Sequence, residues 1–321
     1  MGNCFSPSAP SVLDVICVVE EGMKVYTVAE LKKVTKNFGK EMVLGDSYGK
    51  VVKGYINPKT LSPAKEGVGM AVAVKRFYLT NDQALQEWLV VDLEFLRHNS
   101  HPSLVKLIGY SSDLGMLFVV SEYFSNGSLE DHICRESRPK SLPWVTRIKI
   151  SIGAAQCLAF LHSKKNAGLY RTYLTASKIL LDMEFNARVS YFGLKTLPSD
   201  DEGPHVQYCS YADEPQRFHY APPEYIISGM SNMAGDVYSF GVILLEIITG
   251  FGKKRIILAK RAIRNEKEHI VEMIDPDLEN SYPHDEGLSM CEIIKQCLEE
   301  DPQKRPSMQQ VFDNLSAIAK V

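Results

Sequence analysis

Length, composition and charge exclude several classes of protein at the outset. The chain has 321 residues, of which 45% are hydrophobic and 23% charged. This is ordinary globular composition, with enough chain to bury a sizeable core. The formal net charge of −3 argues against a dedicated nucleic-acid binder. The seven cysteines contain no Cys-x-x-Cys pair, so neither a zinc site nor a disulfide framework is predicted, and a reducing compartment is expected.

The N-terminus predicts a lipid anchor. It reads Met1-Gly2-Asn3-Cys4-Phe5-Ser6, with glycine at position 2 and serine at position 6, as N-myristoylation requires. One myristoyl chain binds membranes only marginally, and a second lipid makes anchoring stable. Cys4 is placed to carry a palmitoyl group. We therefore expect residues 1–24 to be an acylated tether at the cytoplasmic face of the plasma membrane.

Taken in chain order, the first third of the sequence predicts mostly strands. Apolar positions at helical spacing predict a helix over Thr27–Phe38, and Asp82–Arg97 predicts a second one. The strand predictions are Met42–Gly45, Lys50–Ile56, Met70–Tyr78, Leu104–Gly109 and Leu117–Tyr123.

From residue 127 onward the pattern is mostly helical. The predicted helices are Thr146–His162, Val237–Thr249, Cys291–Leu298 and Met308–Ile318. Val237–Thr249 is the most apolar stretch, but it is too short to span a bilayer and contains Glu246. Asp236 and Gly250 suit its start and its end. Strands followed by helices predict an α+β fold.

Nine short motifs follow one another in an order typical of one family. They are Val72-Ala73-Val74-Lys75, His101-Pro102-Ser103-Leu104-Val105-Lys106-Leu107, Ser121-Glu122-Tyr123-Phe124, Asn126-Gly127-Ser128-Leu129, Ile179-Leu180-Leu181-Asp182, Phe192-Gly193-Leu194, Pro222-Pro223-Glu224, Asp236-Val237-Tyr238-Ser239-Phe240-Gly241 and Arg305-Pro306. Each motif alone is weak, but the ordered series is specific. From about Val25 to Ala317 the chain resembles a plant receptor-like cytoplasmic kinase, of the acylated subfamily that begins Met-Gly-x-Cys.

The resemblance implies a bilobal kinase fold. It implies a small N-lobe over residues 25–123, with five strands and one helix, and a larger helical C-lobe over residues 124–321. Glu224 and Arg305 match a buried ion pair of the family, and Asp236 matches the aspartate that braces the catalytic loop. The positions that match the family's nucleotide pocket are Leu44, Gly45, Gly49, Val51, Ala73, Lys75, Asp92 and Glu122.

The phosphate-binding part departs from the family pattern. The loop from Gly45 to Gly49 is one residue short and lacks the middle glycine of G-x-G-x-x-G. Asp46 would put a carboxylate near the phosphates, which is electrostatically unfavourable. Lys75 is present, but the glutamate that pairs with it in the family is replaced by Asp92, which is one methylene shorter.

The catalytic loop departs further, and it is one residue longer than the family's. Aligned on Tyr170-Arg171, the base position is Thr172 and the lysine position is Leu174. Aligned on Ile179, the base position is Tyr173, the lysine position is Thr175 and the asparagine position is Lys178. The metal-binding aspartate of Asp-Phe-Gly is replaced by Tyr191. Neither alignment supplies a carboxylate base or the asparagine, and a phenol is a poor magnesium ligand.

These absences predict a protein that binds rather than catalyses. A general base is typically worth about 10²–10⁴ in rate, and metal and electrostatic stabilisation contribute further. The sequence therefore predicts a pseudokinase that is not an enzyme, has no catalytic or metal-binding residues, and requires no cofactor, although ATP could bind without Mg²⁺. We expect an adaptor or scaffold at the plasma membrane in receptor or immune signalling.

The expected partners are other proteins: receptor kinases, active cytoplasmic kinases or immune receptors. The membrane would be bound through the lipid anchor, and nucleic acid is not expected. Two alternatives stay open. One is a weak or unconventional serine/threonine-protein kinase that retains ATP through Lys75, and the other is a decoy for a pathogen effector. Titration with ATP, with and without Mg²⁺, separates the enzyme from the adaptor.

Overall fold

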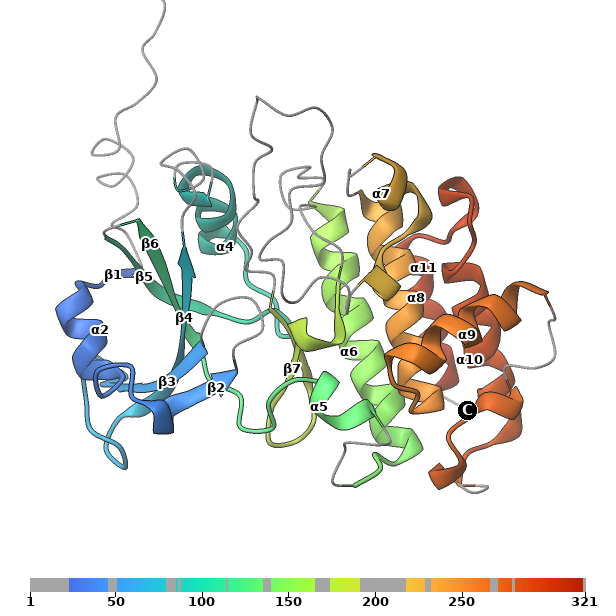
Figure 1. Cartoon of the computed structure of the whole chain (residues 1–321), viewed down its shortest axis with the longest axis horizontal. Helices are drawn as coiled ribbons and strands as arrows, with labels where there is room; N and C mark the ends of the chain where they lie inside the picture. The colour runs from blue at the N-terminus through green and yellow to red at the C-terminus, as the bar shows by residue number, and fades with distance from the viewer. Residues whose placement is uncertain are drawn as a thin grey trace, which may run out of the picture. The chain divides into compact units, whose positions relative to one another are not determined.

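The chain divides into two compact units. The computed structural model describes residues 23–45, 51–78, 85, 88–113, 115–134, 140–164, 174–190, 218–228, 232–265, 271–278 and 281–319. One unit covers residues up to Ser100 together with Lys106–Tyr123, and the other covers His101–Val105 and Phe124 onward. We call them the strand-rich unit and the helical unit (Figure 1).

The strand-rich unit is built on a six-stranded sheet. The strands are β1 (Lys24–Val25), β2 (Val43–Gly45), β3 (Val51–Ile56), β4 (Met70–Tyr78), β5 (Leu107–Asp113) and β6 (Met116–Glu122), in the order β1-β5-β6-β4-β3-β2. Only β1 and β5 run parallel, and the other neighbours are antiparallel. The strand β4 thus lies inside the sheet, between β3 and β6.

The sheet has six strands instead of the five expected, and β1 is the additional one. Its two residues are too few for an alternating pattern to reveal them. Lys24 pairs with Gly109 of β5, and a side chain on Gly109 would collide with the carbonyl oxygen of Lys24. The close approach of these two backbones therefore requires glycine at this position.

The helix α2 (Val28–Val34) closes one side of the sheet. Thr27 begins it with a capping box, in which Thr27 and Glu30 bind each other's backbone N–H groups. Leu31 and Val34 are buried in a core cluster that also contains Tyr26, Ile56, Val72, Val74, Ile108, Phe118 and Val120. The helix ends before the expected Phe38, because residues 36–38 all have positive φ.

The second helical region of this unit is irregular. It contains a π-helical segment, η2 (Trp88–Leu93), followed by α4 (Glu94–His98). Trp88, Leu89 and Leu93 are fully or almost fully buried. Of the expected helix Asp82–Arg97, the described residues are Leu85 and those from Trp88 onward, and all of them are helical.

The helical unit surrounds two long helices, α6 (Trp144–Ser163) and α8 (Met233–Thr249). The other helices are α5 (Glu130–Ile133), α7 (Pro223–Ser228), α9 (Lys253–Asn265), α10 (His284–Cys297) and α11 (Met308–Ile318). Short elements are β7 (Ile179–Leu181), β8 (Ala187–Val189), η4 (Ala176–Lys178), η5 (Phe218–Tyr220), η6 (Val271–Met273), η7 (Pro276–Leu278) and η8 (Pro302–Lys304). The strands β7 and β8 form a hairpin.

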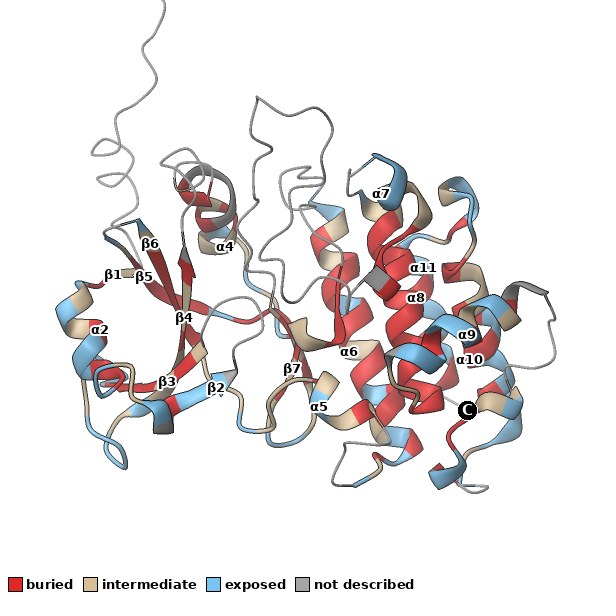
Figure 2. Cartoon of the chain, in the orientation of Figure 1, coloured by how far each residue is buried: buried red, intermediate tan, exposed pale blue. Residues whose placement is uncertain are grey.

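The helix α8 is the core of this unit and is buried along nearly its whole length (Figure 2). It begins four residues before the expected position, because the side chain of Asn232 caps it by accepting from the N–H of Gly235. It ends as expected at Gly250, whose φ of 64° suits glycine. Within the described ranges, no single helix is long and apolar enough to cross a bilayer; α8 and residues 254–263 pass that test only together, across a 107° bend.

Candidate functional site

Three of the residues predicted to bind nucleotide lie in one row across the sheet of the strand-rich unit. Gly45 pairs with Val51, and Val51 pairs with Lys75. On its other side Lys75 pairs with Val119 of β6. Directly opposite residues in antiparallel strands present their side chains on the same face. Val51 and Lys75 therefore share one face of the sheet.

Ala73 joins this face, since it lies two residues from Lys75 on the same strand. The ammonium group of Lys75 lies 4.9 Å from the centroid of the Phe77 ring. Leu44, next to Gly45, is 45% exposed. The structure thus gathers Val51, Ala73 and Lys75 on one face, beside the edge strand that carries Leu44 and Gly45.

Glu122 is placed differently from these residues. It pairs with Val72, which lies on the opposite face of β4 from Ala73. Its N–H donates to the carbonyl oxygen of Lys106 over 3.2 Å, and its side chain accepts from the N–H of Lys106 over 3.1 Å. The described contacts of Glu122 therefore join the end of β6 to the residue that precedes β5.

Two members of the predicted nucleotide site are not tested by this geometry. Gly49 lies outside the described residues. Asp92 belongs to η2, but its side chain lies outside the described part. The predicted pairing of Asp92 with Lys75 stays a prediction.

The substituted catalytic positions are only partly described. Thr172, Tyr173 and Tyr191 lie outside the described residues. Leu174 is 1% exposed and belongs to the core of the helical unit. Lys178 ends η4 directly before β7, and its carbonyl oxygen accepts from the N–H of Ser190 over 2.7 Å. Of the described positions, Leu174 is thus a packing residue, whereas Lys178 is half-buried.

Asp182, the nearest carboxylate after β7, is used by a turn. Its Oδ1 accepts from the N–H groups of Glu184 and Asn186, and the amide of Asn186 donates to both of its oxygens. Burial alone raises the pKa of Asp182, but these hydrogen bonds outweigh burial and hold the pKa below its usual value. Among the described residues, no cluster of three or more His, Cys, Asp or Glu side chains could hold a metal.

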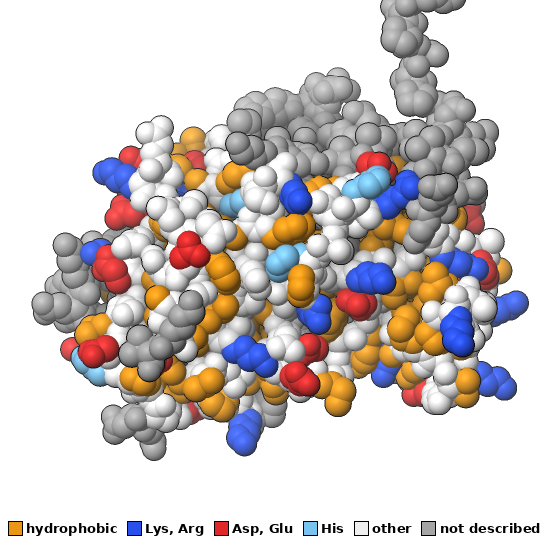
Figure 3. All heavy atoms as spheres, turned by 180° about the vertical axis from the view of Figure 1, so that it is seen from behind, with side chains coloured by type: hydrophobic (Ala, Val, Ile, Leu, Met, Phe, Trp, Pro, Cys, Tyr) orange, Lys and Arg blue, Asp and Glu red, His pale blue; other side chains and the backbone are white. Residues whose placement is uncertain are grey.

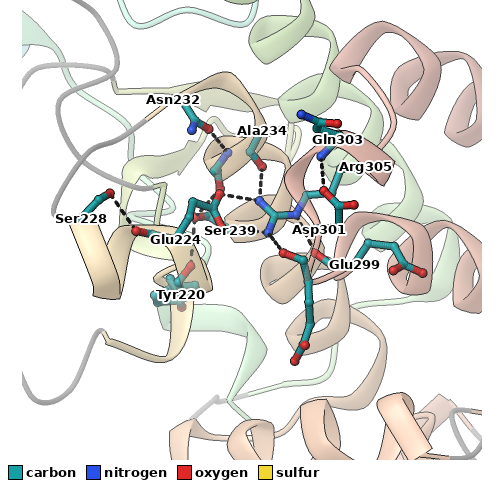
Figure 4. A network of polar contacts seen from close by, with 12 residues as sticks. Tyr220, Glu224, Ser228, Asn232, Ala234, Ser239, Glu299, Asp301, Gln303 and Arg305 are labelled. Carbon is teal, nitrogen blue, oxygen red and sulfur yellow. Dashed lines mark hydrogen bonds and ion pairs between the residues drawn. The ribbon is translucent and has the colours of Figure 1, made fainter.

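The predicted structural pair of Glu224 and Arg305 forms a complete network (Figure 4). Arg305 donates to both carboxylate oxygens of Glu224, over 2.7 and 2.9 Å. Its other donors reach the carbonyl oxygens of Ala234, Glu299 and Glu300. All five N–H groups of a guanidinium are thereby used. The pair joins α7, α8 and the segment before η8.

Asp236, the third structural residue, is 2% exposed near the start of α8. Its Oδ2 lies 3.2 Å from Nε2 of His162 near the end of α6. The catalytic-loop backbone that it is predicted to brace, around residues 171–173, lies outside the described residues. Gly2 and Cys4 lie outside them as well, so lipidation stays a prediction, as do the expected partners.

Sequence reasoning missed a buried cluster around Glu246. The hydroxyl of Tyr220 donates to Glu246 over 2.7 Å, and Nε2 of His219 lies 3.2 Å from its other oxygen. Burial raises the pKa of Glu246, and burial together with the charge of Glu246 raises that of Tyr220. The signal was a carboxylate inside the most apolar run of the chain, since a fully buried charge needs partners.

It also missed Arg147, which lies inside α6. Its guanidinium donates to Asp275, to the hydroxyl of Ser141 and to the carbonyl oxygens of Leu142 and Ile247. This network ties the start of α6 to the end of α8. No local pattern reveals it, because Asp275 lies 128 residues away in the sequence.

Comparison with known proteins gives the family. Residues 38–315 match the family model "Protein tyrosine and serine/threonine kinase". The chain is 66% identical, over its whole length and that of the relative, to serine/threonine-protein kinase SZE1 of Arabidopsis thaliana. It is 40% identical to inactive serine/threonine-protein kinase BKN2 of the same plant, over 100% of the chain and 99% of the relative. It is also 38% identical to serine/threonine-protein kinase BIK1, over 92% of the chain and 76% of the relative.

One prediction is wrong in view of this comparison. The sequence predicted a pseudokinase that is not an enzyme, but the 66% identical relative is named a serine/threonine-protein kinase without qualification. The prediction estimated what is lost when the usual base and metal ligands are absent. That estimate does not apply to a kinase in which other groups replace the usual base and metal ligands. The catalytic loop on which it was made also has one residue more than the family pattern, so its alignment is ambiguous.

The fold prediction is confirmed. A sheet with a helix in one unit and a helical second unit are what an α+β protein-kinase fold requires, and the family model covers both. With relatives of this identity over nearly the full chain, the resemblance to plant protein kinases is confirmed as well. The chain belongs to the protein tyrosine and serine/threonine kinase family.

Proposed function

We propose that the chain is an unconventional serine/threonine-protein kinase that binds ATP through Lys75. The observation that carries the proposal is the 66% identity, over the whole of both chains, to a relative named a serine/threonine-protein kinase. The strand-rich unit supports it through the place of Lys75 on β4, between β3 and β6. In this family a lysine at this position pairs with the α- and β-phosphates.

Lys75 suits a phosphate ligand for two physical reasons. A lysine ammonium is a compact charge with three donors, so it can follow phosphate oxygens without a fixed fork geometry. Its strand is paired on both sides, with β3 over residues 70–75 and with β6 over residues 72–78, so Lys75 has a partner on each side. The position of the Lys75 backbone is therefore set before ligand binds, and little free energy is lost in ordering it.

The residues at the family's metal positions do not fit magnesium. That cation prefers carboxylate oxygens, whereas Tyr191 replaces the aspartate and, in the alignment on Ile179, Lys178 replaces the asparagine. The proposed kinase is unconventional because the residues that hold magnesium in the family are replaced. The chain's own contribution is to bind and orient the triphosphate through Lys75 and the residues that share its face of the sheet.

The test is phosphate transfer by the purified full chain. Radiolabelled ATP is supplied with a general protein substrate, with Mg²⁺, with Mn²⁺ and with chelator, for the wild type and for Lys75→Ala. We expect incorporation into serine or threonine, and a loss of about 10²-fold in Lys75→Ala, the size typical of removing one electrostatic contact to the transition state. Lys32→Ala, on the exposed side of α2, is the matched control and should keep full activity.

A thermal-shift titration with ATP separates binding from transfer. Stabilisation that grows with ATP concentration in the wild type, and is absent in Lys75→Ala, is expected if Lys75 holds the nucleotide. Phosphate transfer that is no greater in the wild type than in Lys75→Ala, under all three metal conditions, would overturn the proposal. Any activity that survives unchanged in Lys75→Ala would then belong to a contaminant.

A further inference from the structure

The helix α9 carries charges of one sign only. Its sequence, from Lys253 to Asn265, contains six Lys and Arg residues and no Asp or Glu. One side of the helix packs against the helical unit, where Ile256, Ala259 and Ile263 are nearly fully buried. These three residues recur at a spacing of three and four, which places them on a single face. The opposite side of α9 is therefore the one that meets solvent (Figure 2).

Four exposed residues form a row along this outer side. Lys254, Ile257, Leu258 and Arg261 are all exposed. Their spacing of i, i+3, i+4 and i+7 places them side by side on one helix face, and we call them the α9 stripe. Ile257 is 43% exposed and Leu258 is 63% exposed. The stripe therefore has two protruding apolar side chains at its centre and one cation at each end, with the cations about 10 Å apart along the helix axis.

Two further cations of α9 are engaged within the protein and are not members of the stripe. The guanidinium carbon of Arg255 lies 3.9 Å from the centroid of the Phe251 ring. The ammonium of Lys260 donates to the carbonyl oxygen of His219 over 2.6 Å and lies 5.0 Å from the centroid of the Tyr238 ring. The contacts of Lys260 hold α9 to η5 and to α8. The stripe thus lies on an ordered helix, so less conformational entropy is lost when it binds.

An ordinary solvated helix face does not account for the α9 stripe. Solvated surfaces mix charges of both signs, as do the interspersed basic and acidic side chains on the face shown in Figure 3. The sequence of α9 instead contains no acidic residue. Single exposed apolar residues are common, but Ile257 and Leu258 are adjacent and lie between two cations. This combination indicates a binding surface.

The chemistry of the stripe favours an anionic lipid surface over a protein. Protein partners are bound through anchor residues that enter pockets and through matched charges of both signs. The stripe consists of protruding apolar groups and charges of one sign. A leaflet with anionic lipids is negative throughout, and its headgroup region accepts apolar side chains at the acyl boundary. The long side chains of Lys and Arg can then reach back to the headgroups.

We propose that the α9 stripe is a peripheral membrane-binding surface for a bilayer that contains anionic lipids. Ile257 and Leu258 enter the boundary between headgroups and acyl chains. Lys254 and Arg261 pair with anionic headgroups on either side of them. The helix lies along the bilayer surface and does not cross it. Because a folded helix makes this contact, it is independent of the predicted N-terminal acylation and of the proposed binding of ATP.

The test measures how much of the purified full-length chain sediments with sucrose-loaded vesicles. The chain carries Gly2→Ala, so that the predicted myristoyl group does not contribute to binding. The vesicles contain either equal parts of phosphatidylcholine and phosphatidylserine or phosphatidylcholine alone. We expect binding to the anionic vesicles at low salt and at least tenfold weaker binding to the neutral ones. Binding to the anionic vesicles should also fall as salt is added, because salt screens the attraction.

Substitutions in the stripe should weaken this binding by different amounts. Lys254→Gln and Arg261→Gln should each lower the partition coefficient about fivefold, because one basic residue near an anionic surface contributes about that factor. Leu258→Asp should lower it at least tenfold, because it removes an inserted apolar group and adds a charge that the surface repels. All three substitutions change exposed side chains, so the variants should fold, and circular dichroism checks this.

Two matched substitutions on the same unit serve as controls. Val145→Asp introduces the same charge at an apolar residue of α6 that is 76% exposed. Lys304→Gln removes an exposed charge from η8 in the same way as the substitutions at the two ends of the stripe. Both controls should leave vesicle binding unchanged.

Three results would overturn the proposal. The first is equal binding of Leu258→Asp and the unsubstituted helix to the anionic vesicles. The second is an equal loss of binding in Val145→Asp or Lys304→Gln, because the effect would then follow the net charge of the chain and not the α9 stripe. The third is no binding to the anionic vesicles at low salt. If polyglutamate then binds, and Arg261→Gln weakens it, the α9 stripe is a surface for an acidic protein segment instead.

Discussion

Among the described residues, the ion pairs of the strand-rich unit are partly exposed, whereas the helical unit also contains buried ones. In the strand-rich unit, the side chains of Lys24 and Glu30 are 26% and 29% exposed. In the helical unit, those of Arg147 and Asp275 are 3% and 0% exposed. The strand-rich unit is stabilised by strand ladders and an apolar cluster, so its ion pairs contribute little to its structure. The helical unit joins separate helices and loops through buried charges.

This difference in the burial of ion pairs predicts which charge substitutions each unit tolerates. A surface pair contributes about 0–1 kcal/mol, because water screens it and long side chains must be ordered. Removing one partner of a buried pair instead leaves a charge that is neither hydrated nor paired. We therefore expect the stability of the chain to be far more sensitive to charge substitutions in the helical unit.

The largest effect is expected from Arg147→Met. It leaves Asp275 buried without its guanidinium, together with the carbonyl oxygens of Leu142 and Ile247. The free energy of unfolding of the helical unit should fall by about 3–5 kcal/mol. Urea unfolding followed by tryptophan fluorescence measures it in a Trp88→Phe background, because Trp144, in the same helix as Arg147, then reports on this unit alone.

The double variant Arg147→Met with Asp275→Asn is the control. If the network acts as a unit, adding Asp275→Asn should cost much less than Asp275→Asn does alone. A loss below about 1 kcal/mol in Arg147→Met would mean that the buried pair behaves like an exposed one. The contrast between the two units would then fail at its strongest point.

The contacts of Arg147 also show how much of the structure could be predicted from the sequence. The strand β4 was predicted to the residue, because nine residues of strand pattern leave little choice of boundary, and Lys75 came with it. A single arginine inside a helix, such as Arg147, instead gives no sign of being buried, since its partner is set by the tertiary fold. The enzymatic status was predicted wrongly for a similar reason: one sequence shows which groups are missing, but not which groups replace them.

An intermediate effect is expected at Asp182, whose side chain is 25% exposed. Asp182→Asn removes the charge that accepts from Glu184 and Asn186 and should cost about 1 kcal/mol at neutral pH, the low end for charged hydrogen bonds because the group is partly solvated. The pKa of Asp182 is lowered by folding. The stabilisation is therefore present above the unfolded-state pKa of about 3.9 and is lost as the pH falls through the folded-state pKa.

Urea unfolding of the wild type and Asp182→Asn at a series of pH values measures this effect. The difference between the two proteins should be constant from neutral pH down to about pH 5 and should close at lower pH. A difference that does not change with pH would show that the turn depends on the shape of the side chain and not on its charge.

The smallest effect is expected from Glu30→Gln in the strand-rich unit. Glutamine can still accept from the N–H of Thr27, as glutamate does over 2.9 Å, so the capping box is kept. Only the ion pair with Lys24, at 3.0 Å, is lost. The free energy of unfolding should fall by about 0.5 kcal/mol or less at low salt, and by nothing measurable at high salt, where the pair is screened.

Thr27→Ala, which removes the cap itself, should cost about 1 kcal/mol at either salt concentration. Trp88 fluorescence in a Trp144→Phe background reports on this unit. If Glu30→Gln cost as much as Thr27→Ala, and kept that cost in high salt, charge would matter at the edge of the sheet as well, and burial alone would not explain why the two units differ.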